Sequence, residues 1–134
     1  MIGYLGSIDD AAKKNNNFRQ ILFTSAHMQL ILMSLLPKEE IGNEMHDTVD
    51  QFFHVEMGEA KFVFNDKEEH IVVAGDAMIV PAGTYHNVIN TSSTKPLKLY
   101  TIFAPPNLRD GIIHQTRADA ESGNEPFIGK TTKL

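Results

Sequence analysis

The chain has 134 residues, of which 42% are hydrophobic and 22% charged, a composition typical of one globular domain with a single core. Its net charge of −5, with scattered lysine and arginine, argues against a nucleic-acid partner. The absence of cysteine excludes disulfides, thiolate metal sites and a cysteine nucleophile. The N-terminus has no signal-peptide pattern and no apolar stretch is long enough to span a membrane, so we expect a cytoplasmic protein with no membrane partner.

In chain order, residues 1–17 are expected to form an N-terminal segment that ends in a polar, solvated run over 13–17. The core is expected over residues 18–104, where short apolar segments alternate with turn residues. Residues 105–134 form a polar tail with a short helix at 117–122, and packing on the barrel and packing on a partner subunit are both open. Strands are expected at 18–24, 27–36, 51–57, 60–65, 69–74, 77–80, 84–90 and 97–103.

These short strands are separated by Gly, Pro and Asn at regular intervals, and no segment of the core keeps a helical apolar period. The pattern favours an all-β, antiparallel sandwich or barrel over alternating strand–helix units.

Alternation along each strand predicts which side chains face the interior. The sets expected inside are Phe53, Val55 and Met57, then Thr84, His86 and Val88, and, on the last strand, Leu97, Leu99, Thr101 and Phe103, which leaves Lys98 in solvent. The implied cavity is apolar with a few polar groups, as in small-molecule sites. The candidate ligand contacts, set against plain core packing, are Phe53, Val55, Val88, Tyr100 and Phe103.

Four polar side chains are candidates for a metal site inside this barrel. Glu44 and His46 are two residues apart and share a face in an extended chain, Gln51 follows five residues later, and His86 comes just after a Pro-x-Gly turn. Imidazole and carboxylate ligands suit Fe, Mn, Ni or Zn, so the set predicts one divalent transition metal.

The stretch from Gly75 to Asn90 resembles the second signature of the cupin superfamily. The fixed positions are met in order by Gly75, Pro81, Gly83, His86 and Asn90, with five, one, two and three residues between them. The resemblance implies a cupin β-barrel, also called a double-stranded β-helix or jelly roll, which holds a metal and assembles as a homodimer.

The first cupin signature is kept in spacing but changed in residues. Glu44 stands where the first histidine is expected, Gln51 where the glutamate is expected, and Lys38 where the leading glycine is expected, whereas His46 and Gly58 match. With neutral imidazoles, Glu44, His46, Gln51 and His86 sum to a charge of −1, the same as a set of three histidines and one glutamate. The attraction for a divalent cation is therefore retained, while the amide is a weaker donor than a carboxylate.

Each candidate has an ordinary structural alternative. His86 could be a hydrogen-bonded core histidine, His46 an exposed histidine in an acidic loop, and Glu44 part of a solvated charge run with Glu39 and Glu40. Gln51 is open between metal ligand, orienting group and plain polar residue of the barrel.

Three functions of different classes follow. The first is a metalloenzyme in which the metal polarises a small oxygenated substrate and either Glu44 or a bound water moves a proton. The cupin resemblance implies dioxygenase- or isomerase-type chemistry. The second is a non-catalytic module that binds or senses a small molecule. The third is a structural dimer with an empty barrel, whose interface would contain the outward-facing residues Phe52, Tyr85 and Ile89.

Overall fold

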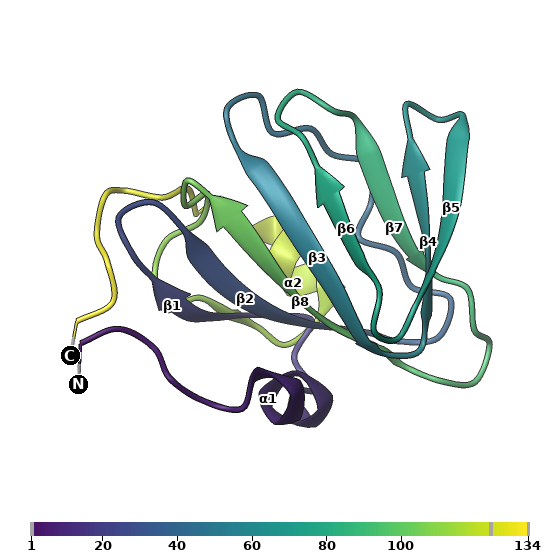
Figure 1. Ribbon diagram of the computed structural model, residues 1–134, viewed down its shortest axis with the longest axis horizontal. Helices are drawn as coiled ribbons and strands as arrows, with labels where there is room; N and C mark the ends of the chain where they lie inside the picture. Colours follow the sequence, from purple (N-terminus) through teal and green to yellow (C-terminus); the bar gives the residue numbers. More distant parts are fainter. Residues whose placement is uncertain (1, 124, 134) are drawn as a thin grey trace.

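A computed structural model describes residues 2–123 and 125–133, in which two antiparallel sheets face each other (Figure 1). One sheet has six strands in the order β6-β3-β8-β2-β1-β9, and the other has three in the order β5-β4-β7. The predicted all-β, antiparallel fold is therefore confirmed. The strands are β1 (Arg19–Thr24), β2 (Gln29–Leu35), β3 (Asp50–Met57), β4 (Glu59–Phe64), β5 (Glu68–Val73), β6 (Ala77–Val80), β7 (His86–Asn90), β8 (Leu97–Ala104) and β9 (Ile113–His114).

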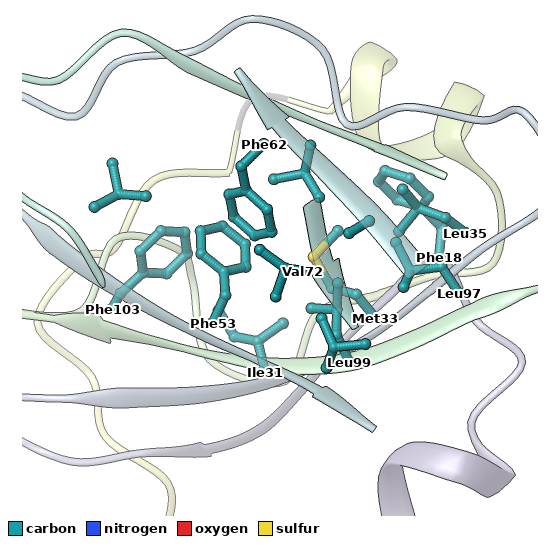
Figure 2. Close-up of a cluster of buried hydrophobic side chains, with 14 of the residues drawn as sticks. Phe18, Ile31, Met33, Leu35, Phe53, Phe62, Val72, Leu97, Leu99 and Phe103 are labelled. Atoms are coloured by element: carbon teal, nitrogen blue, oxygen red, sulfur yellow. The ribbon is translucent and has the colours of Figure 1, made fainter. Parts of the chain in front are cut away.

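The core lies between the two sheets, where large apolar side chains interdigitate (Figure 2). Along β3 the exposure alternates as predicted up to Val55, with Phe53 and Val55 buried and Phe52 and His54 half-buried. The expectation that Met57 also faces the interior is wrong: it is 41% exposed, because the β3–β8 register shifts between Val55 and Met57. Phe53 meets Phe62 of the opposite sheet edge-to-face, with ring centroids 5.0 Å apart. Because both rings are fully buried, this contact joins the sheets at the centre of the barrel.

A short helix, α1 (Ile8–Lys14), packs on the outer face of the six-stranded sheet, against β8, β2 and β3 (Figure 1). It has acidic residues in its first turn and lysines in its last, the order that favours the helix dipole. Ala12 is its buried contact with the sheet.

This helix corrects two expectations. Lys98 is only 5% exposed rather than in solvent, and its ammonium donates to the carbonyl oxygen of Asn15 and to Oδ1 of Asn16. Asn15 itself is buried, so the polar run over 13–17 is not entirely solvated. Alternation placed Lys98 on the outer face correctly, but α1 covers that face.

The tail packs on the barrel of its own chain. β9 pairs with β1 and extends the six-stranded sheet. The second helix, α2 (Arg117–Ser122), has the bounds predicted from sequence and begins with a capping box between Thr116 and Asp119. Thr132 donates its backbone NH to the carbonyl oxygen of Thr24. The tail therefore contacts β1 at the start of the strand, through β9, and again at the end of the strand, through Thr132. Neither helix among the described residues is long and apolar enough to cross a membrane.

Candidate metal centre

Backbone pairing brings Glu44 and His86 together. The turn before β7 contains Gly83, whose φ of 79° suits glycine, and the Gly83 NH donates to the carbonyl oxygen of His46 at 2.9 Å. His86 and Glu44 then exchange two backbone hydrogen bonds, each 2.9 Å long. Residues paired in this way present their side chains on the same face, so the turn and the bridge aim Glu44 and His86 at one point.

His46 completes a compact cluster. One potential ligand atom from each of Glu44, His46 and His86 lies within 4.8 Å of the other two. Oε1 of Glu44 is 3.4 Å from Nε2 of His46 and 3.7 Å from Nε2 of His86, and the ring centroids of the two histidines are 5.8 Å apart. Two imidazoles and a carboxylate at this spacing form a donor set suited to a divalent transition metal.

The hydrogen bonds of His86 fix which ring nitrogen is free. Nδ1 lies 2.9 Å from the carbonyl oxygen of Thr84, which can only accept, so Nδ1 carries the proton. In the neutral ring Nε2 therefore holds a lone pair, and this atom is buried without a hydrogen-bond partner. Nε2 of His46 is likewise buried and without a partner. Buried polar atoms of this kind are rare and call for an explanation, which a metal ion would supply.

The far side of the His46 ring meets the tail. The amide of Asn107 lies 3.4 Å from Nδ1 of His46 through its nitrogen. Turning this amide over would place its oxygen there as an acceptor for an Nδ1 proton, which is the arrangement that leaves Nε2 free for a metal. Sequence reasoning missed Asn107, because nothing in the tail pattern marks a contact with a residue 61 positions earlier.

Gln51 is buried and anchored by one end of its amide. Its nitrogen donates to Oγ1 of Thr101 at 3.1 Å, and Thr101 in turn donates to the carbonyl oxygen of Phe52 at 2.7 Å. The oxygen of Gln51 is buried with no hydrogen-bond partner. This leaves a fixed acceptor available to a metal, a water molecule or a ligand.

Four of the five candidate ligand contacts face the interior. Phe103 meets the His46 ring edge-on at 5.2 Å, and Phe53 lies 6.3 Å from the His86 ring. Val55 and Val88 are buried members of the core. The two phenyl rings flank the imidazoles with apolar surface, which limits the access of water to them.

The expectation that Tyr100 contacts a ligand inside the barrel is wrong. Tyr100 lies on the opposite face of β8 from Phe103, where its ring stacks on His54 with centroids 5.2 Å apart. Alternation already separates position 100 from 101 and 103, so this residue cannot contact a ligand inside the barrel.

The ionisation of Glu44 reflects its neighbours. Burial alone raises the pKa of this carboxyl, but the contact with His46 and the charges of His46, Arg19 and His86 together outweigh it, so the pKa lies below its ordinary value.

Arg19 is a second residue that sequence reasoning missed. It lies opposite Met33 in the β1–β2 pairing and thus on the barrel face of β1, and its alternation with Ile21 was the available signal.

A family model described as a cupin domain matches residues 31–103, a little over half of the chain. This chain belongs to the cupin family. It is 45% identical over 127 residues to YrkC of Bacillus subtilis (strain 168), covering 91% of this chain and 68% of that protein. It is 40% identical over 116 residues to L612 of Acanthamoeba polyphaga mimivirus, covering 85% and 72%. The crystal structure of BH2720 from Bacillus halodurans matches with 40% identity and a TM-score of 0.87, covering 90% of this cupin and 94% of that chain.

Proposed function

We propose that this cupin binds one divalent transition metal, Fe, Mn, Ni or Zn, through Glu44, His46 and His86, and acts on a small oxygenated organic molecule beside it. The observation that carries the proposal is the pair of buried histidine Nε2 atoms without partners, within 4.8 Å of a carboxylate oxygen. Gln51 is proposed as a fourth donor or as an anchor for a bound water, through its free oxygen.

The roles of the residues follow from their surroundings. A bound divalent metal would polarise an oxygen atom of the ligand. Glu44 directs Oε1 at both imidazoles, and we assign to its other oxygen the transfer of a proton to and from the ligand. The Thr84 carbonyl fixes the orientation of the His86 ring. Phe53 and Phe103 exclude water, which strengthens electrostatic interactions inside the barrel. Dioxygenase- and isomerase-type reactions are the two classes that such a site serves.

Metal content tests the proposal directly. Protein purified without a histidine tag and reconstituted with Fe²⁺, Mn²⁺, Ni²⁺ or Zn²⁺ is expected to retain about one ion per chain after desalting. His86→Ala and Glu44→Gln should lower the retained metal at least about tenfold. His27→Ala, at an exposed position between β1 and β2, is the matched control and should retain the wild-type amount. Retention below about one-tenth of an ion by the wild type, or equal retention by His86→Ala, would overturn the proposal.

The alternative is a non-catalytic cupin that binds or senses a small molecule. The observation in its favour is the replacement of one acidic residue by Gln51, whose amide nitrogen is occupied by Thr101 and whose oxygen is a weak metal donor. This alternative requires that a ligand still raise the melting temperature after chelation. Loss of all ligand stabilisation in EDTA would exclude it. We further propose that the protein is a homodimer, which light scattering at micromolar concentration tests. We also propose that it is located in the cytoplasm.

A further inference from the structure

Glu44 also forms part of the wall of a small pocket of about 180 Å³ between the start of β1 and α2. The other walls come from Phe18 and Arg19 at the start of β1, from Ile41, and from α2 with Arg117 and Glu121. At about 30 Å³ per water molecule, this volume equals roughly six waters, which is room for a metabolite of a few non-hydrogen atoms. Glu44 is therefore shared between this pocket and the candidate metal cluster.

Arg19 brings an unpaired positive charge to this pocket. Its side chain is half-buried, and its guanidinium carbon lies 5.7 Å from the centroid of the Phe18 ring. Over residues 2–123 and 125–133, no carboxylate oxygen lies within 4.0 Å of it. A guanidinium that is partly removed from water and has no anionic partner is poised to bind an anion.

Arg117 brings a second guanidinium from the tail. Its Nη2 lies 3.0 Å from Oε1 of Glu121, while its Nε is buried and has no hydrogen-bond partner. Nη2 lies so close to Gly42 that a β-carbon added there would be 3.0 Å away. Gly42, whose φ is 101°, thus leaves the space that the arginine occupies. The Nε–H donor of the Arg117 guanidinium therefore remains unused beside the pocket.

Two guanidiniums and two carboxylates line the pocket, so its charges balance until a metal binds Glu44 and leaves room for an anion. Arg117 is paired with Glu121, and Glu44 is assigned to the metal, which leaves Arg19 and the positive charge of the metal site uncompensated. Planar guanidinium forks match the geometry of carboxylates, and the small volume disfavours bulky anions.

We propose that the ligand of this cupin is a small carboxylate, bound between Arg19 and Arg117 with its reactive oxygen directed toward Glu44. The inference rests on the proposed metal site, because Glu44 is shared by the pocket and the cluster. It names a substrate class and adds two binding residues, one from the barrel and one from the tail.

The test compares lactate with its neutral amide, lactamide. On Mn²⁺-loaded protein, paramagnetic broadening of the NMR signals should appear for lactate and be absent for lactamide at equal concentration. Arg19→Met and Arg117→Met should each weaken lactate binding by about ten- to a hundredfold, the value of a charge-assisted hydrogen bond. Arg109→Met, an exposed arginine on another face, is the matched control and should bind like the wild type. Arg19→Lys keeps the positive charge but loses the planar pair of donors, so its affinity for lactate should lie between those of Arg19→Met and the wild type. Circular dichroism of this variant reports whether it folds.

The outcomes separate this inference from the proposed function. Normal metal retention with equal lactate binding in wild type, Arg19→Met and Arg117→Met overturns the carboxylate site and leaves the metal site standing. Tighter binding of inorganic phosphate than of lactate, with the same dependence on Arg19, also overturns the carboxylate assignment. If the wild type retains no metal, saturation-transfer NMR on the metal-free protein decides. Lactate binding that depends on both arginines supports the pocket although the proposed function fails, and independence from them overturns it.

Discussion

Nδ1 of His86 lies 2.9 Å from the carbonyl oxygen of Thr84, only two residues earlier in the chain. The ring is therefore held by the same turn that begins β7, and its second nitrogen is directed at Glu44. Since Thr84 contributes only its backbone, the side chain at position 84 is free to vary without altering the orientation of the histidine. In the candidate metal centre, the His86 ring is thus oriented by a backbone carbonyl, whereas the His46 ring contacts the side chain of Asn107.

Metal binding should stabilise the fold. At a free Mn²⁺ concentration a hundredfold above the dissociation constant, we expect the free energy of unfolding to rise by about 2.7 kcal/mol, because only the folded chain assembles the ligand set. Thermal melts with and without Mn²⁺ measure this rise. It should be absent from His86→Ala, and an equal rise in that variant would contradict the ligand assignment.

Replacing Gln51 by glutamate should strengthen metal binding. The substitution places a carboxylate where a buried amide oxygen has no partner, and an added charge raises affinity for a divalent cation, here by about tenfold. Without metal the same variant should melt below the wild type, since a buried carboxylate is costly. Isothermal titration with Mn²⁺ measures the affinity, and Gln115→Glu, at an exposed position, is the control. Unchanged affinity in Gln51→Glu would place the amide outside the metal's reach.

The ionised form of Glu44 should stabilise the metal-free fold. Because its folded-state pKa is below the ordinary value of 4.5, its contribution is present above that value and is lost as pH falls through the folded-state pKa. In EDTA, Glu44→Gln should therefore be less stable than the wild type at about pH 7, and the difference should shrink toward about pH 3. Urea denaturation at both values measures it. A difference that grows on acidification would refute the sign.

Removing the ammonium of Lys98 should destabilise the packing of α1. Lys98→Met leaves the carbonyl oxygen of Asn15 and the side-chain oxygen of Asn16 without their donor, at an expected cost of about 1–3 kcal/mol. Urea denaturation provides the measurement. Lys95→Met, at an exposed position on the loop before β8, should stay within about 0.5 kcal/mol of the wild type.

Local patterns were sufficient for the barrel. Alternation placed Phe53, Val55 and Val88 inside, and the Pro-x-Gly spacing located the turn that presents His86. Both signals act over a few residues, where side-chain period and turn geometry are determined by the chain itself. The grouping of Glu44 with His46 followed from their spacing in the same way.

Contacts across long sequence separations were not predictable. Lys98 meets Asn15 over 83 positions and Asn107 meets His46 over 61, and neither pair has a period or motif that reports its partner. Arg117 reaches the pocket because α2 folds back on the barrel, which a short polar helix in the sequence does not indicate. The residues that sequence reasoning missed are mostly those that depend on how the two ends of the chain dock.

The tail lines the pocket through α2, which lies outside both sheets, whereas its β9 belongs to the six-stranded sheet. Its Arg117 and the neighbouring Asn107 meet the site from outside, whereas the ligand atoms of the candidate metal set come from the barrel and the loop that bridges to β7. Substitutions in α2 should therefore alter the fit of the proposed ligand while strand register and the candidate metal ligands stay unchanged. For protein engineering, this division makes α2 the place to alter the selectivity for the proposed ligand, with the strand and loop that carry the candidate metal ligands left intact.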